Sequence, residues 1–209
     1  MPVERDDIVG VLLAGGQSRR MGGGDKSLRH LAGRPILSHV IERIRGQVGR
    51  LVLNANGDPE RFAGYGLPVA PDVVEGQPGP LAGVLTGMRW AAQHAPEAHW
   101  VLTVATDAPF VPTDIVSRLT AAIEAEGAEL ACVASGGRRH PVIGLWPVRL
   151  ADNLQNAIEQ ENIRKVDLWT ARFKLSVAAF PEKPTDPFFN VNHPDDLEEA
   201  ERVYEQVAR

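Results

Sequence analysis

Residues 8–26 read IVGVLLAGGQSRRMGGGDK, an apolar run that passes directly into a glycine-rich, basic loop. The apolar part, Ile8–Leu13, has the length and composition of a buried β-strand. The loop carries five glycines and three fixed positive charges, from Arg19, Arg20 and Lys26. Glycines let backbone N–H groups approach phosphate oxygens, and Arg and Lys neutralise the phosphate charge. The stretch therefore predicts a strand followed by a polyphosphate-binding loop around which the fold is organised.

Two common phosphate-binding motifs do not fit this loop. A P-loop has Gly directly before its Lys-Ser or Lys-Thr pair, whereas Asp25 precedes Lys26 here. A dinucleotide fingerprint reads G-x-G-x-x-G, and the pair Gly15-Gly16 does not open that pattern. P-loop GTPases and NAD-dependent enzymes are therefore disfavoured. A flexible loop with solvated arginines is the weaker interpretation, because three cations would gather without a ligand in an otherwise acidic chain.

Composition restricts the class of partner. The chain has 209 residues, 44% of them hydrophobic, which suits a single domain over residues 1–209 with a sizeable core. Its formal net charge of -5 disfavours nucleic-acid binding, because phosphate backbones need a basic face. The basic loop is therefore a local feature that suits a small anionic ligand.

Cysteine content and hydropathy predict a cytoplasmic protein. The single cysteine, Cys132, can form no intramolecular disulfide and lies in an apolar run typical of a core strand. The N-terminal residues are polar and acidic, unlike a signal peptide, and no run of about 18 apolar residues predicts a membrane span.

Apolar runs alternate with helical patterns along the chain. Strands are expected at Ile8–Leu13, Leu51–Asn54, Leu67–Ala70, Trp100–Ala105, Leu130–Ala134, Val142–Trp146 and Leu175–Ala179. Helices are expected at Pro35–Arg45, Pro80–His94, Thr113–Glu126, Pro147–Glu161 and Pro194–Val207. This alternation predicts an α/β fold with a mostly parallel, Rossmann-like sheet between two helical layers. Ligands of such sheets bind at the carboxyl ends of the strands.

Several polar residues follow predicted strands and are therefore candidate ligand contacts. Asp107 follows the strand Trp100–Ala105, where a carboxylate can hold Mg²⁺ against substrate phosphates. The alternative role for Asp107 is to cap a turn before Pro109. Asn54 and Asp72 can bind a base or ribose through amide and carboxylate hydrogen bonds, although both are also common turn residues.

Other candidates lie in later loops. Gly76–Gly83 is rich in glycine and proline and opens a helix, whose N–H groups suit an anionic ligand; a plain connection is the alternative. His140 precedes Pro141 and a strand, which favours a structural or substrate-positioning role over metal ligation. Asn190 and Asn192 lead into the last helix, where ligand contact and helix capping are both open.

Five segments, taken in order, resemble one family. They are Leu13–Lys26, Pro78–Gly83, Thr106–Pro109, His140-Pro141 and Asn190–Pro194. Together they resemble the molybdenum cofactor guanylyltransferases of the nucleotidyltransferase superfamily. The resemblance implies a three-layer fold of the nucleotide-diphospho-sugar transferase type. It also implies that GMP passes from GTP to the terminal phosphate of molybdenum-molybdopterin, forming the guanine dinucleotide cofactor and pyrophosphate.

The resemblance assigns roles to individual residues. The GTP-binding set is Leu13, Ala14, Gly15, Lys26, Asn54, Asp72 and Asp107, with Asp107 as the Mg²⁺ ligand. Lys26, Arg20 and Asp107 form the catalytic set, and Arg19, His140, Asn190 and Asn192 are placed on the molybdopterin side. The family further implies transient contacts with molybdenum-insertion proteins and molybdoenzyme chaperones.

Three alternatives remain open from the sequence. A molybdopterin cytidylyltransferase or a sugar-phosphate nucleotidyltransferase would use the same chemistry on another base or acceptor. A non-catalytic nucleotide-binding or cofactor-delivery protein could share the fold, because fold alone does not fix function.

Overall fold

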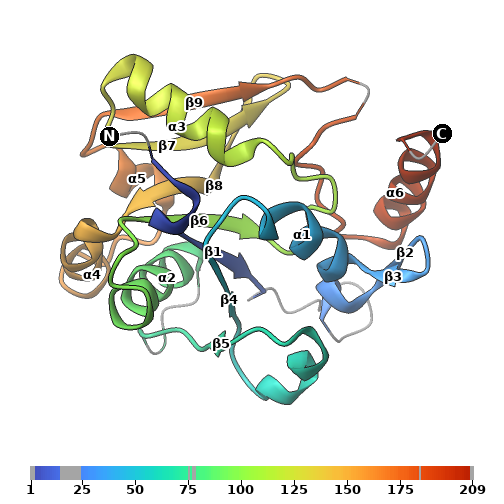
Figure 1. The fold of residues 1–209 in the computed structure, drawn as a ribbon, viewed down its shortest axis with the longest axis horizontal. Coiled ribbons are helices and arrows are strands. Elements are labelled where there is room, and N and C mark those ends of the chain that lie inside the picture. Colours follow the sequence, from blue (N-terminus) through green and yellow to red (C-terminus); the bar gives the residue numbers. More distant parts are fainter. Residues whose placement is uncertain (1–2, 15–24, 75, 77–78, 184, 208–209) are drawn as a thin grey trace.

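A seven-stranded sheet forms the centre of the computed structural model, which describes residues 3–14, 25–74, 76, 79–183 and 185–207 (Figure 1). The strand order is β5-β4-β1-β6-β8-β7-β9. Their bounds are β1 Ile8–Leu13, β4 Arg50–Asn54, β5 Val69–Ala70, β6 Trp100–Ala105, β7 Leu130–Ser135, β8 Arg138–Pro147 and β9 Leu175–Phe180. β8 pairs antiparallel with β6 and β7, and every other pairing in this sheet is parallel, which confirms the predicted mostly parallel sheet.

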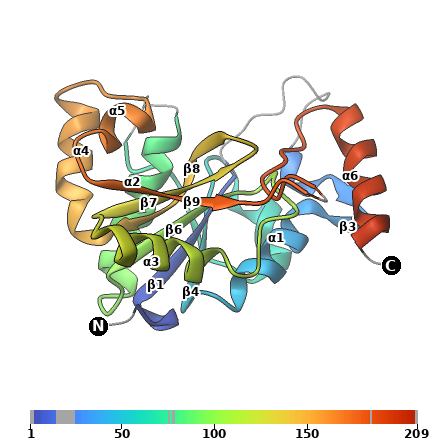
Figure 2. The same ribbon diagram turned by 90° about the horizontal axis from the view of Figure 1, so that it is seen from above.

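Helices cover both faces of the sheet, as Figure 2 shows. They are α1 Ile36–Arg45, α2 Pro80–His94, α3 Ile115–Glu126, α4 Ala151–Glu159, α5 Val166–Thr170 and α6 Pro194–Val207. The side chains of β1 alternate between the two faces of the sheet, which explains the three layers. Ile8 and Leu12 pack into the cluster that contains residues of α1 and α3. Val9 and Val11 pack into the cluster that contains residues of α2, α4 and α5.

The antiparallel strand β8 brings its own first residues to the edge of the sheet where the parallel strands end. Because β8 runs opposite to its neighbours, its first residues lie where β6 and β7 end. Trp146 anchors the other end of β8, since its indole Nε1 donates to Oγ1 of Thr103 on β6 at 2.7 Å. A register shift between Cys132 and Val133 separates the two halves of the β7–β8 pairing. The carboxyl edge therefore carries the start of one strand among the ends of the others.

Most predicted elements are observed, and the exceptions have local causes. The predicted helix Pro147–Glu161 begins instead as the 3-10 helix η5, Val148–Leu150, because the Val148 N–H donates to the His99 carbonyl at 2.9 Å and keeps the chain beside the sheet. α5 and the hairpin of β2 (His30–Leu31) and β3 (Arg34–Pro35) are not predicted, because elements of two to five residues are too short to show periodicity.

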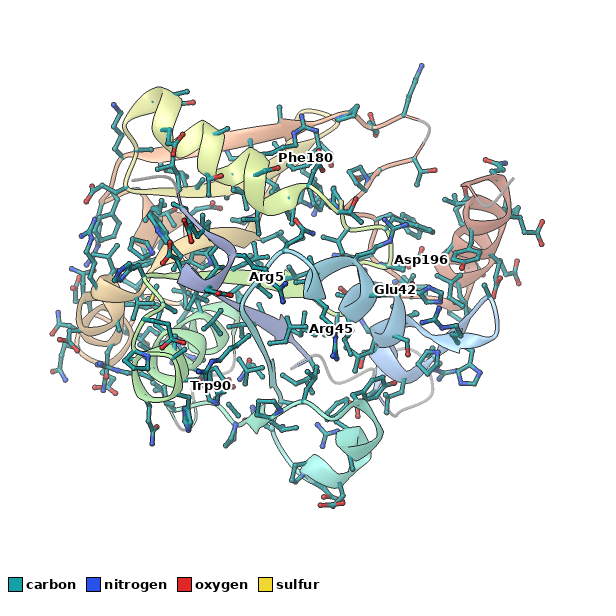
Figure 3. All side chains as sticks on the ribbon, viewed as in Figure 1. Arg5, Glu42, Arg45, Trp90, Phe180 and Asp196 are labelled. Carbon is teal, nitrogen blue, oxygen red and sulfur yellow. The ribbon has the colours of Figure 1, made fainter. Side chains whose placement is uncertain are left out.

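The last helix, α6, stands apart from the sheet and beside the β2–β3 hairpin (Figure 1). Glu201 on α6 accepts a hydrogen bond from the Ala32 N–H at 2.8 Å, and Tyr204 meets the ring of His39 on α1 edge to face. Asp196 marks the start of α6, and Phe180 at the end of β9 lies beside α3 (Figure 3). Among the described residues, none of the helices combines the length and apolarity needed to cross a membrane.

Candidate active site

A cavity of about 330 Å³ lies at the carboxyl edge of the sheet. Its lining comes from the ends of β1, β4 and β6, from the start of α2, and from the segment that follows the glycine-rich loop. The lining residues are Leu13, Ala14, Asp25, Lys26, Ser27, Asn54, Asn56, Asp72, Gly79, Pro80, Gly83, Ala105, Thr106, Asp107 and Val142. Leu13, Ala14, Lys26, Asn54, Asp72 and Asp107, all expected as ligand contacts, therefore share one cavity.

Backbone hydrogen bonds fix the floor of the cavity at the end of β1. The N–H of Ala14 donates to the Asn54 carbonyl at 2.9 Å, which extends the pairing of β1 with β4. The Leu13 carbonyl accepts from the Thr106 hydroxyl at 3.0 Å and from the Thr106 N–H at 3.3 Å. The chain therefore enters the glycine-rich loop from a fixed point. Gly15, Arg19 and Arg20 lie outside the described residues.

Lys26 lies where the described chain resumes after that loop, in the 3-10 helix η3, Lys26–Leu28. Its Nζ donates to Oδ1 of Asn192 at 2.7 Å, so the ammonium group is directed toward the segment before α6. The Val191 N–H in that segment donates to the Asp107 carbonyl at 2.9 Å. Two residues predicted to bind phosphate or metal are thus joined to one loop.

Asp107 is a partly buried carboxylate at the cavity wall. Burial raises the pKa of Asp107 above its usual value, and the positive charge of Lys26 acts in the opposite direction. In the described ranges, no three His, Cys, Asp or Glu side chains are grouped for a metal ion. Mg²⁺ commonly binds to one or two carboxylates together with waters and substrate phosphates. A single carboxylate fits this ion in a cavity where the ammonium group of Lys26 is available to substrate phosphates.

A hydrogen-bonded network holds Asn54 and Asp72 on the β4 side of the cavity. Nδ2 of Asn54 donates to Asp72 Oδ1 at 2.9 Å and to the Ala70 carbonyl at 3.1 Å. Asn56 binds Asp72 twice: its Nδ2 donates to Oδ2, and its Oδ1 accepts from the Asp72 N–H, both at 2.8 Å. The Asp72 carboxylate is therefore held by two amides. The spacing of Asn54 and Asn56 on alternate residues is the sequence signal for this pair.

The start of α2 lines the cavity from the face of the sheet that carries Val9 and Val11. Gly79, Pro80 and Gly83 line it, and a helix N-terminus favours negative charge. A Cβ on Gly83 would lie 2.6 Å from both Asn54 Oδ1 and Leu13 Cδ2. Glycine is therefore required at position 83 for α2 to approach the ends of β1 and β4.

A second, more polar cavity of about 520 Å³ lies beyond Asn192. Its lining residues are Arg138, His140, Asp186, Phe188, Phe189, Asn190, Asn192, His193 and Asp196. The candidates His140, Asn190 and Asn192 thus meet here and not in the first cavity. Lys26 lines the first cavity and Asn192 lines the second, so their hydrogen bond lies between the two.

His140 is held by Ser135, which is held in turn by Asp186, and the sequence reveals neither contact. The buried Ser135 hydroxyl lies 2.8 Å from His140 Nε2 and donates to Asp186 Oδ1 at 2.7 Å. Because the hydroxyl proton is directed to the carboxylate, Nε2 of His140 is the donor in the first of these bonds. Burial lowers the pKa of His140 below its usual value, Asp186 acts to raise it, and Arg138 acts to lower it.

Comparison with known proteins identifies the family of this arrangement. A family model described as a MobA-like NTP transferase domain matches residues 10–172. The chain belongs to this family. The match extends from β1 across the whole first cavity to the end of α5, so the family likeness includes the strand-end residues described above.

Full-length relatives support the same assignment. The chain is 58% identical over 196 residues to a molybdenum cofactor guanylyltransferase of Bradyrhizobium sp. (strain ORS 278), covering 94% of this chain and 92% of that protein. It is 54% identical over 193 residues to one of Rhodopseudomonas palustris (strain BisB5), covering 92% of each. These relatives establish the chain as a nucleotidyltransferase of this type.

Solved structures agree on the fold. The molybdopterin-guanine dinucleotide biosynthesis protein A of Archaeoglobus fulgidus has a TM-score of 0.73 at 25% identity, with 95% of this chain and 99% of that chain covered. A CMP:2-keto-3-deoxy-manno-octonic acid synthetase solved with CTP has a TM-score of 0.68 at 14% identity, covering 96% and 98%, which shows the fold alone. The predicted nucleotide-diphospho-sugar transferase fold is confirmed.

Proposed function

We propose that this chain transfers GMP from GTP to the terminal phosphate of molybdenum-molybdopterin, with release of pyrophosphate. The observation that carries the proposal is the single cavity shared by Lys26, Asp107 and the Asn54–Asp72 network, in a chain whose close relatives are named molybdenum cofactor guanylyltransferases. Residues 1–209 are proposed to act as one domain, with GTP on the N-terminal part and the acceptor toward the C-terminal part.

The reaction needs positioned charge more than a protein nucleophile. An oxygen of the acceptor phosphate attacks the α-phosphorus of GTP, and the bond from that phosphorus to the β-phosphate oxygen breaks. Pyrophosphate leaves with the electron pair. The attacking phosphate is already ionised near neutral pH, so no strong base is required, and rate enhancement comes from alignment and electrostatic stabilisation.

The residues of the first cavity divide this work. The Lys26 ammonium donates hydrogen bonds to the phosphates, and Asn54 and Asp72 bind the guanosine. Asp107 would hold Mg²⁺, which when bound supplies positive charge to the triphosphate. Arg20 and Gly15, which precede Lys26 in the same loop, are proposed to complete the phosphate contacts, as the family resemblance implies.

The second cavity is proposed to hold the acceptor. His140, Asn190 and Asn192 offer ring and amide hydrogen-bonding groups there, and Arg138 adds positive charge. Arg19 is proposed to act on the same side. The Lys26–Asn192 hydrogen bond supports this arrangement, because it joins the lining of this cavity to the residue proposed to bind phosphate. The cytoplasmic location and the contacts with insertion proteins and chaperones stay predictions.

A comparison of the four nucleoside triphosphates as donors tests the proposal. The protein is incubated with molybdenum-molybdopterin and each of the four nucleoside triphosphates, and the dinucleotide product and pyrophosphate are measured. GTP is expected to be the preferred donor, and Lys26→Ala and Asp107→Ala are expected to abolish transfer while the protein stays folded. A preference for CTP, or transfer to sugar phosphates in parallel assays, would support the alternative transferases. GTP binding without pyrophosphate release would indicate a delivery protein.

A further inference from the structure

Arg61 contacts two segments that line the first cavity, although it is not among the described residues that line it. It lies in the 3-10 helix η4, Pro59–Tyr65. Its Nε lies 2.7 Å from Oδ2 of Asp25 in an ion pair. Its Nη2 donates to the carbonyl of Asn56 at 2.6 Å, and its Nη1 donates to the carbonyl of Asp58 at 2.9 Å. Nη1 and Nη2 therefore each donate a hydrogen bond, whereas the contact of Nε with Asp25 is an ion pair without hydrogen-bond geometry. Asp25 and Asn56, two of the three partners, line the first cavity.

The surroundings of Arg61 restrict its orientation. Its guanidinium carbon lies 4.7 Å from the centre of the Phe62 ring, and Phe62 itself is buried. The side chains of Arg61 and Asp25 are 28% and 19% exposed, less than both partners in the surface pair of Arg50 with Glu97, at 52% and 50%. An ion pair that is partly withdrawn from water, and whose guanidinium also lies over an aromatic ring, holds its geometry better than an exposed pair.

The contacts of Arg61 extend on both sides to the proposed ligand groups. On one side, Asp25 directly precedes Lys26 and is the N-cap residue of η3. On the other side, Asn56 binds both the carboxylate and the N–H of Asp72, which in turn accepts from Asn54. An unbroken series of polar contacts therefore joins the residue before Lys26 to the Asn54–Asp72 network.

We propose that Arg61 is a positioning residue for GTP. It holds the segment carrying Lys26 at a fixed separation from the Asn54–Asn56–Asp72 network, so that the phosphate and guanosine contacts are set before the nucleotide arrives. Groups fixed in advance reduce the entropy lost on binding. The proposal rests on the function proposed above, because it takes Lys26 to bind phosphate and Asp72 to bind guanosine.

Substitution of Arg61 tests this role through the affinity for GTP. Arg61→Met keeps an apolar stem and removes all three contacts, and it is expected to weaken GTP binding and raise the KM for GTP by about tenfold. The kcat at saturating GTP is expected to stay within about twofold, because the bound nucleotide can itself order the two segments. Loss of kcat at unchanged KM would indicate a merely structural role and would overturn the proposal.

Two further variants serve as controls. Arg61→Lys keeps the charge opposite Asp25 but lacks the planar fork that spans Asp25 and the two carbonyls, so an intermediate KM is expected. It also provides the test if Arg61→Met does not fold. Arg50→Met removes an ion pair and a backbone contact at the opposite end of β4, and the KM is expected to stay unchanged. An equal rise of the KM in Arg50→Met and Arg61→Met would overturn the assignment to Arg61.

A double-mutant comparison tests the pairing itself. Asp25→Asn alone is expected to weaken GTP binding. Adding Asp25→Asn to Arg61→Met is expected to raise the KM for GTP by less than about twofold over that of Arg61→Met alone, because the two changes break the same ion pair. If the rise in KM of the double variant equals the product of the rises in the two single variants, the pairing is overturned. If the wild-type protein neither binds GTP nor transfers GMP, the proposed function fails. If the wild-type protein is active and Arg61→Met matches it, only the role of Arg61 fails.

Discussion

Lys26 and Asn192, 166 positions apart in the sequence, are joined by a 2.7 Å hydrogen bond from Nζ to Oδ1. Lys26 lines the cavity proposed for GTP, and Asn192 lines the cavity proposed for the acceptor. The bond therefore fixes the direction of the ammonium group between the two cavities, where the two substrates are proposed to meet.

Asn192→Ala is expected to lower kcat about ten- to hundredfold while changing the affinity for GTP by less than about threefold, because alignment of the reacting groups is lost more than binding. Isothermal titration with GTP and single-turnover transfer would measure the two effects separately. Asn156→Ala on α4, whose amide binds the exposed Glu161, is the matched control and should leave both unchanged. A normal kcat in Asn192→Ala would contradict the alignment role.

Asp107→Asn is expected to reduce GMP transfer by about a thousandfold or more, because the site loses the carboxylate that would hold the divalent ion. The free energy of unfolding is expected not to fall, since the change removes a charge that burial disfavours. Transfer assays and urea denaturation measure the two quantities. Asp152→Asn, on the surface of α4, is the control, and near-wild-type turnover in Asp107→Asn would remove the metal assignment.

Gly83→Ala is expected to raise the KM for GTP about tenfold and to lower the free energy of unfolding by about 1–3 kcal/mol, because the new methyl group overlaps Asn54 and Leu13. Gly87→Ala, one turn later in α2, is the control, because its new methyl group would lie 2.5 Å from Cγ2 of Val11 in the core. This variant separates the effect on stability from the effect on KM. It should destabilise the protein similarly with little change in KM. Equal KM values for the two variants would show that Gly83 has no special relation to the site.

Cys132 is expected to resist thiol reagents in the folded protein. It is buried, and burial raises the pKa of its thiol to about 11, so the reactive thiolate is scarce at pH 8. Ellman's reagent should therefore modify the native protein slowly and modify it fully in guanidinium chloride. Rapid reaction of the native protein at pH 8 would mean that β7 opens readily.

His140 is expected to make stability depend on pH on the acidic side. Burial holds its pKa in the folded protein below its usual value, so the unfolded chain binds the proton more readily. Stability is therefore lost as pH falls below about 6.5, the usual value for His. His140→Gln should reduce this slope by on the order of a few tenths of a kcal/mol per pH unit, since the ring is partly exposed. Urea denaturation between pH 7 and pH 5 measures it, and an unchanged slope would refute the assignment.

Sequence patterns predict most of the fold because the long elements carry strong periodicity. β1 and β6 are observed at the predicted bounds, as is α2, since continuous apolar runs and proline at a helix start are clear signals. The strand-end rule also placed Asn54, Asp72 and Asp107 in one cavity. The antiparallel direction of β8 could not be predicted, because an apolar run contains no information on the direction of its neighbour.

The supporting residues of the site are also invisible in the sequence. Arg61 contacts Asp25, far earlier in the chain, and Ser135 contacts Asp186 across 51 positions. Side chains of these types are common on protein surfaces, and only the tertiary fold shows what they touch. Asn56 differs, because its place two residues after Asn54, just beyond the end of β4, indicates the same edge of the sheet.

The reversed direction of β8 has a consequence for how such a protein can diversify. The cavity proposed for GTP is formed by parallel strands joined through long helical crossovers, where an inserted residue would disturb the packing of a whole layer. The cavity proposed for the acceptor instead borders the tight β7–β8 hairpin, whose turn contains Gly136 and Gly137, both at positive φ. Hairpin turns accept changes of length without moving the strands behind them. If the two cavities bind the substrates proposed for them, acceptor choice can evolve in this architecture while the nucleotide site stays fixed.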